Sequence, residues 1–202
     1  MHDGQMILSI QPKINMFDGF LPMTWEGMFE LFDKSNVFFG ERRRLEVDET
    51  FQQLIPYVLV VDAEHNVLTY RRSKQAGEQR LHGLRALGFG GHVDLQDASK
   101  PSFHLPTTLH NAVGRELKEE LGISRAWTFD WRGMVCTHKT PVDRVHLGLV
   151  AVVEVRTNAP RAVDPEISDL QWVDQDDLVD DDSWESWSSL LITALKEGSL
   201  KL

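Results

Sequence analysis

Three glutamates, Glu116, Glu119 and Glu120, are spaced so that they fall within one sector of a helix. A run of charges on a helix is commonly just a solvated face. Carboxylates that border a buried surface, however, need a compensating charge, because an unpaired buried carboxylate is costly or takes up a proton. A hard divalent cation supplies that charge, and Mg²⁺ binds carboxylate oxygens together with waters and substrate phosphates. The spacing therefore indicates a site for Mg²⁺ (or Mn²⁺).

The helix that carries these glutamates is predicted from its two ends and its apolar stripe. Thr107 or Thr108 suits the N-cap, and Gly122 suits the left-handed position that follows a helix. Arg115 and Lys118 are expected on the water side of the helix. The apolar stripe that faces the core consists of Leu109, Val113, Leu117 and Leu121.

A glycine-rich strand precedes this helix. Residues 84–91 form the expected strand, and its glycines at positions 88, 90 and 91 permit a close approach of the backbone to another group. Further strands are expected from β-branched and apolar runs over residues 55–61, 67–72, 127–136 and 144–155. A final helix follows an acidic stretch, with its apolar face made by Trp184, Trp187, Leu190, Leu191, Ala194 and Leu195. Strands in hairpins that alternate with helices predict an α/β (α+β) fold with a mixed sheet.

The stretch from Arg115 to Ile123, with Gly90 and Gly91 on the strand before it, resembles the signature of the Nudix hydrolase superfamily, Gly-x5-Glu-x7-Arg-Glu-U-x-Glu-Glu-x-Gly-U, where U is aliphatic. The second half of the signature matches at every fixed position. The resemblance implies an α/β/α sandwich and the hydrolysis of a diphosphate bond in a nucleoside diphosphate linked to another group. It also implies that Glu116, Glu119 and Glu120 bind the metal and that Arg115 orients a glutamate.

The first half of the signature departs from the family pattern. Residues 92–114 number 23, where the signature has 13, so this chain carries 10 more. Asp97 stands where the first glutamate is expected when positions are counted from Gly91, and Asp94 is the other carboxylate nearby. Asp97 is therefore our candidate for a further metal ligand. The composition of residues 96–106 is typical of a loop, which would either shape the substrate pocket or extend into solvent.

Other candidates for the site lie outside the signature. Glu166 precedes a Leu-Gln-Trp-Val strand, an arrangement that is similar to the corresponding segment of many Nudix proteins. It is a candidate for an additional ligand or the general base, and the alternative is a solvated loop residue. Arg72 and Lys139 are candidates for binding the substrate, together with Gly90 and Gly91, although a lysine in a polar loop is more commonly just exposed to solvent.

Composition limits the classes of partner. The 202 residues carry a formal net charge of −10, with a pI near 5.2. Binding of duplex nucleic acid needs a basic surface, so we exclude it and expect a nucleotide or other diphosphate as the partner. The one cysteine, Cys136, excludes an internal disulfide and is expected to be buried. Without a leader or an apolar run of about 18 to 20 residues, the chain is expected in the cytoplasm, with no membrane span.

We divide the chain into an N-terminal extension, residues 1–52, that packs on the core, and a Nudix-like hydrolase domain, residues 53–202. In the extension, Thr24 suits a helix N-cap. An apolar face follows at helical spacing, and it would pack on the core or form the surface of a homodimer; its members are Trp25, Met28, Phe29 and Phe32.

Two other functions stay open. A non-catalytic protein of the same fold would bind a nucleotide without cleaving it. An isopentenyl-diphosphate isomerase would carry a catalytic cysteine in a Cys-Gly-His segment, where this chain has Gly90-Gly91-His92. His92 is a metal ligand in that reading, and a structural histidine in the plainer one. The three retained glutamates favour hydrolysis.

Overall fold

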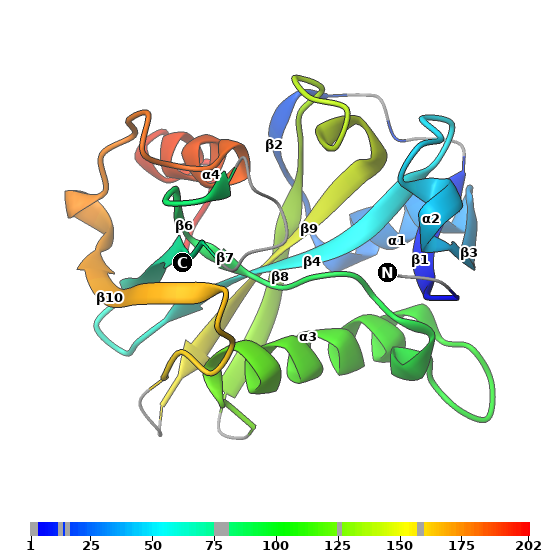
Figure 1. Cartoon of the computed structure of the whole chain (residues 1–202), viewed down its shortest axis with the longest axis horizontal. Helices are drawn as coiled ribbons and strands as arrows, with labels where there is room; N and C mark the ends of the chain where they lie inside the picture. Colours follow the sequence, from blue (N-terminus) through cyan, green and yellow to red (C-terminus); the bar gives the residue numbers. More distant parts are fainter. Residues whose placement is uncertain (1–3, 12–13, 15–16, 75–80, 125–126, 157–159) are drawn as a thin grey trace.

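The computed structural model describes residues 4–11, 14, 17–74, 81–124, 127–156 and 160–202 (Figure 1). The strands are β1 (Met6–Gln11), β2 (Gly19–Pro22), β3 (Asn36–Glu41), β4 (Gln52–Val61), β5 (Asn66–Arg72), β6 (Arg85–Ala86), β7 (Gly88–Phe89), β8 (Trp127–Cys136), β9 (His146–Val155) and β10 (Ile167–Asp174). The helices are α1 (Trp25–Asp33), α2 (Arg42–Leu45), α3 (Leu105–Leu121) and α4 (Ser186–Lys196), with short 3₁₀ turns η2 (Leu95–Asp97), η3 (Asp143–Val145) and η4 (Gln175–Asp177).

All the strands belong to one mixed sheet. Its main path runs β10-β5-β4-β9-β8-β2. The neighbours β4 and β9 are parallel, and the other pairs along this path are antiparallel. β4 is buried at all ten positions, as expected for a central strand covered on both faces. The predicted mixed sheet is therefore confirmed.

A helix covers each face of this sheet (Figure 1). Val58 and Val60 of β4 pack in one apolar cluster with Leu117 of α3. Because successive residues of a strand point to opposite faces, Leu59 of β4 packs instead in a second cluster with Leu191 of α4. The arrangement is an α/β/α sandwich, as the sequence predicted.

Residues of the predicted N-terminal extension contribute strands to the same sheet. β1 pairs with both β3 and β4, and β2 pairs with β8. α1 follows the predicted N-cap Thr24, whose side chain accepts a hydrogen bond from the Gly27 N–H. Most of its apolar face packs inward: Met28 and Phe32 are buried, and Trp25 stacks on Trp131 with ring centroids 5.8 Å apart. A homodimer through this face stays a prediction.

The ends of α3 differ in how well the sequence predicted them. Gly122 takes the expected left-handed conformation, with φ of 69°. The helix begins at Leu105, however, and not after Thr107 or Thr108, so that prediction was wrong. The reason is Pro106, which fits the first turn of a helix because its missing N–H would have no partner there. The predicted stripe of Leu109, Val113, Leu117 and Leu121 is buried.

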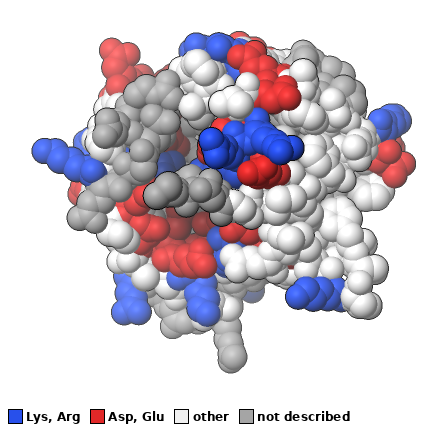
Figure 2. Space-filling model, turned by 45° about the vertical axis from the view of Figure 1, so that its right-hand side comes forward, with Lys and Arg blue, Asp and Glu red and all other residues white. Residues whose placement is uncertain are grey.

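Acidic residues outnumber basic residues in the chain, 31 to 21. Figure 2 shows acidic side chains gathered on part of one face, with basic side chains scattered among them, in keeping with the net charge of −10. Within the described ranges, none of the helices is both long enough and apolar enough to cross a membrane.

Candidate functional site

The glycine-rich strand lies directly against the glutamates of α3. The Gly90 N–H donates to Glu120 Oε2 at 3.0 Å. Gly90 has a φ of +143°, and a Cβ at this position would lie 2.0 Å from the Pro56 carbonyl oxygen. A Cβ at Gly91 would lie 2.8 Å from Glu116 Oε1. The close approach that the glycines predicted is therefore present, and its partners are the Pro56 carbonyl, Glu116 and Glu120.

Arg115 holds two of the glutamates and a more distant carboxylate. Its Nη1 donates to Glu116 Oε1 and Glu119 Oε2, both at 2.9 Å. Its Nε and Nη2 donate to the two oxygens of Asp97 at 2.9 and 3.0 Å, and Nη2 also donates to the His92 carbonyl at 2.9 Å. The Arg115 side chain is 18% exposed, so its predicted place on the water side was wrong. It faces a ring of acceptors instead.

Asp97 lies at the end of η2, before the connection to α3. Both of its oxygens face Arg115, and Oδ2 also accepts the Asp94 N–H at 2.9 Å. A metal-ligand role for Asp97 stays a prediction. In the described structure its carboxylate is engaged by the arginine, which points to a role in holding Arg115.

The loop that precedes α3 lies against the N-terminal segment. Residues 98–104 connect η2 to α3, and the ring of Phe103 meets that of Phe39 on β3 edge to face, with centroids 6.0 Å apart. The Asn111 side chain donates to the Asp97 carbonyl at 3.0 Å and so ties the helix to the start of this loop. Both predicted outcomes for the loop, a pocket wall or a solvent excursion, stay open.

Burial raises the pKa of two of the glutamates. Burial raises the pKa of Glu116 to about 7, although the Arg115 charge and hydrogen bond act to lower it. Burial, and next the charge of Glu116, raise the pKa of Glu120 well above its usual range, against the lowering effects of Arg72 and of the Gly90 N–H. These carboxylates are crowded in a poorly solvated place, where a bound cation would stabilise their ionised forms.

The donor set fits a hard divalent cation. Carboxylate oxygens are the ligands that Mg²⁺ and Mn²⁺ prefer. The described residues contain no three His, Cys, Asp or Glu side chains already arranged as a cage for a cation. Mg²⁺ does not require one, because it commonly takes one or two carboxylates and completes its shell with water and substrate phosphates.

Glu166 lies in a turn near the end of α3. The Val163 N–H donates to the Glu120 carbonyl at 2.9 Å, and the Ser73 N–H donates to the Glu166 carbonyl at 2.8 Å. These bonds place the turn between the C-terminal end of α3 and the end of β5, on the side of the site where Glu120 lies. The general-base role of Glu166 stays a prediction.

The two predicted basic residues have different surroundings. Arg72, at the end of β5, is buried for the most part, and its Nε donates to Glu185 Oε2 at 3.3 Å. Lys139 is exposed in the connection between β8 and β9, which lies away from α3 in Figure 1. The structure brings Arg72 toward the glutamates but gives no contact that joins Lys139 to them, and a substrate role for Lys139 stays a prediction.

Glu185 is a residue that sequence reasoning did not identify. It is the N-cap of α4 and lies 113 positions from Arg72. In sequence it belongs to an acidic stretch, which is typical of a helix N-terminus and gives no sign of a distant partner.

Comparisons with known proteins agree with this geometry. The family model of the NUDIX domain matches residues 53–194. Protein YmaB of Bacillus subtilis (strain 168) is 29% identical over 207 residues, which cover 95% of this chain and 98% of the relative. This relative therefore also spans most of the segment before residue 53.

Solved structures share the fold. The crystal structure of Tm1382, described as a candidate Nudix hydrolase, matches with a TM-score of 0.73 and 25% identity, over 95% of this chain and 98% of that one. The NUDIX domain of Shewanella oneidensis NrtR, solved in complex with ADP ribose, matches with a TM-score of 0.54 and 17% identity, over 74% of this chain and 89% of that domain. The NrtR match is a likeness of fold alone.

Proposed function

Because the chain belongs to the Nudix family, whose hydrolases generally cleave pyrophosphate bonds, we propose that it hydrolyses the diphosphate bond of a nucleotide-derived or other small diphosphate compound with the help of a divalent cation. The observation that carries the proposal is the cluster of Glu116, Glu119 and Glu120 on α3. It faces the Gly90-Gly91 backbone and contains two carboxylates whose pKa burial raises. Such groups are suited to bind a cation, and Glu116, with a pKa raised to about 7, is suited to exchange protons near neutral pH.

The three glutamates would hold Mg²⁺ or Mn²⁺. When bound there, the cation neutralises phosphoryl oxygens and lowers the pKa of a water ligand. The protein's own part is to fix the carboxylates. Arg115 keeps Glu116 and Glu119 in place, Asp97 holds Arg115, and the Gly90 N–H fixes Glu120.

A carboxylate must also take the proton of the attacking water. Glu166 is one candidate, because its turn lies beside the end of α3, and a glutamate of the cluster is the other. Attack at phosphorus with proton removal by a carboxylate expels a phosphate ester as the leaving group.

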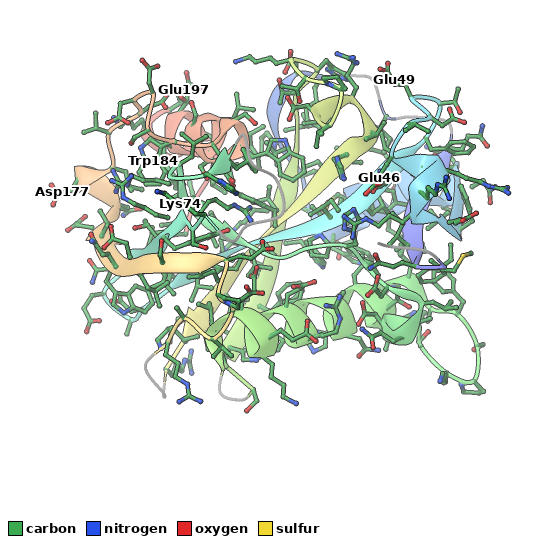
Figure 3. All side chains as sticks on the ribbon, in the orientation of Figure 1. Glu46, Glu49, Lys74, Asp177, Trp184 and Glu197 are labelled. Carbon is green, nitrogen blue, oxygen red and sulfur yellow. The ribbon has the colours of Figure 1, made fainter. Side chains whose placement is uncertain are left out.

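The proposal is tested by hydrolysis of a panel of nucleoside triphosphates, sugar nucleotides, dinucleoside polyphosphates and ADP-ribose with Mg²⁺ or Mn²⁺. The variants are Glu116→Gln and Glu120→Gln, and the matched control is Glu197→Gln, an exposed glutamate at the end of α4 that is labelled in Figure 3. We expect metal-dependent turnover of at least one class, lost in both cluster variants and kept in the control. Metal-dependent binding without turnover across the panel would instead favour a non-catalytic nucleotide-binding protein.

A further inference from the structure

Arg72 is held on one side by a buried carboxylate that the hydrolytic cluster does not use. Its Nε donates to Glu185 Oε2 at 3.3 Å, and the two side chains are 22% and 6% exposed. The two segments that meet here are the end of β5, near Lys74, and the start of α4, near Trp184, and both of these residues are labelled in Figure 3. Arg72 is thus fixed from the α4 side of the sheet.

The Glu185 carboxylate is itself fixed by the Tyr57 hydroxyl, which Ser188 holds in turn. Tyr57 on β4 donates to Glu185 Oε1 at 2.5 Å, and its hydroxyl lies 2.8 Å from Ser188 Oγ. Ser188 Oγ also accepts the Leu87 N–H at 2.9 Å. A Cβ at Gly88 would lie 2.1 Å from the Tyr57 ring, so glycine at position 88 is what allows the ring to reach Glu185.

If its role were only structural, this network would contribute little to the stability of the fold. Burying an ion pair removes two charges from water, and well-packed apolar side chains in its place are often as stable or more stable. A buried tyrosine, serine, glutamate and arginine held together where β4, β5 and α4 meet therefore need an explanation besides stability. The position of the arginine supplies one.

A short series of contacts leads from Arg72 to the glutamate cluster. The guanidinium carbon lies 5.5 Å from the centroid of the Tyr70 ring, and the Tyr70 hydroxyl donates to the Gly88 carbonyl at 3.2 Å. Two residues further on, the Gly90 N–H donates to Glu120. Arg72 is also close enough for its charge to lower the pKa of Glu120.

Two nitrogens of the Arg72 guanidinium have no hydrogen-bond partner among the described residues. Among the residues that the structure describes, no hydrogen bond reaches Nη1 or Nη2 of Arg72, while Nε is used by Glu185. Burial lowers the pKa of Arg72, but the neighbouring acidic groups, Tyr70 and Glu185 first among them, raise it above its ordinary value, so Arg72 stays a cation. A planar guanidinium with two nitrogens that no described residue binds matches the oxygens of a phosphoryl group.

We propose that Glu185, fixed by Tyr57 and Ser188, is a positioning residue that holds the Arg72 guanidinium beside Glu120, so that Nη1 and Nη2 bind the phosphoryl oxygens of the substrate's diphosphate. The inference rests on the proposed function, because it takes the diphosphate to lie at the glutamate cluster. It assigns one end of that group to the cation site and the other to Arg72.

The test measures the binding of methylenediphosphonate, a diphosphate analogue that cannot be hydrolysed, in the presence of Mg²⁺ by calorimetry. The variants are Arg72→Gln, Glu185→Gln, Tyr57→Phe and the double variant of Arg72 and Glu185. The matched control is Arg71→Gln, because Arg71 is the neighbour on β5 and pairs with the exposed Asp169 instead. Thermal unfolding of each variant shows whether it is folded.

We expect Arg72→Gln to weaken the binding of the analogue by about tenfold or more, since a charge-assisted hydrogen bond is lost. Glu185→Gln weakens it by a smaller factor in the native background and not at all in the Arg72→Gln background, because Glu185 acts through Arg72. Tyr57→Phe shifts the affinity for the analogue in the same direction as Glu185→Gln. Because it retains the charges of Arg72 and Glu185, it replaces Glu185→Gln in the test if that variant does not fold. Arg71→Gln leaves affinity unchanged.

Three results would overturn the inference. The first is unchanged or tighter binding of the analogue by Glu185→Gln and Tyr57→Phe, and the second is an equal loss of affinity from Glu185→Gln in the native and Arg72→Gln backgrounds. The third is no binding of the analogue by the native protein. Failure of the proposed function looks different. If the protein cleaves no compound of the panel but binds the analogue with the expected coupling between Arg72 and Glu185, the inference stands and the hydrolase function is rejected.

Discussion

The pairing of Asp97 with Arg115 gives a prediction that separates two roles for Asp97. As a metal ligand, Asp97 would contribute chiefly to cation binding. As the partner of Arg115, it contributes to the stability of the metal-free protein. The change Asp97→Asn keeps the size of the side chain and one acceptor oxygen but removes the charge, so it distinguishes these roles with little change in packing.

The magnitude follows from the contacts. Two N–H donors of Arg115 reach Asp97 at 2.9 and 3.0 Å, and the Asp97 side chain is 4% exposed. A hydrogen bond to a charged group contributes about 1.5 to 3 kcal/mol. Arg115 keeps its contacts with Glu116, Glu119 and the His92 carbonyl, which limit the loss. We therefore expect Asp97→Asn to lower the free energy of unfolding by about 2 kcal/mol.

The assay is urea unfolding in EDTA, with and without a later addition of Mg²⁺. The matched control is Asp130→Asn, because Asp130 is 66% exposed and pairs with Arg132 at the surface, where the expected loss is below about 1 kcal/mol. The reasoning is refuted if, in EDTA, Asp97→Asn and the control lose equally little free energy of unfolding while Asp97→Asn weakens Mg²⁺ binding. That result would make Asp97 a metal ligand.

Three further outcomes are expected. Gly90→Ala lowers the free energy of unfolding by about 3 kcal/mol because its Cβ meets the Pro56 carbonyl. The control Gly198→Ala, at a φ of +74° in open space, lowers it by about 1 kcal/mol. Equal losses of the two variants in urea unfolding would contradict the close approach at Gly90. In EDTA the raised pKa of Glu116 favours its protonated form in the folded state, so the free energy of unfolding of the native protein falls as pH rises from about 4.5 to about 7. We expect this fall to be about 3 kcal/mol larger than in Glu116→Gln. The same pH profile for both proteins would oppose this. Cys136 is fully buried with its pKa raised to about 11 by burial, so it reacts with a thiol reagent at pH 8 only after urea is added; labelling of the folded protein at the rate of a free thiol would be contrary evidence.

The parts of the site that lie within one helix could be predicted from sequence, because helical spacing fixes them. Glu116, Glu119 and Glu120 lie on the predicted helix, and Arg115 reaches Glu119 across one turn. The start of that helix was misplaced, since a threonine cap is a strong signal and a proline in the first turn is a weaker one.

The contacts that cross the fold could be predicted less well. Counting from Gly91 made Asp97 a candidate, but its pairing with Arg115, 18 positions away, depends on how η2 packs against α3. The bond from Tyr57 to Glu185 spans 128 positions and forms only once α4 covers the sheet. No local sequence pattern indicates such a contact, so only the structure shows that Glu185 and Tyr57 support Arg72.

The most direct test of the carboxylate cluster is a Mn²⁺ titration of the protein, followed by electron paramagnetic resonance of the free ion. We predict that the native protein and Glu197→Gln bind Mn²⁺ with the same affinity, and that Glu116→Gln and Glu120→Gln bind it at least about tenfold more weakly. Equal binding in all four proteins would contradict the account, because the cation would then lie somewhere other than on α3.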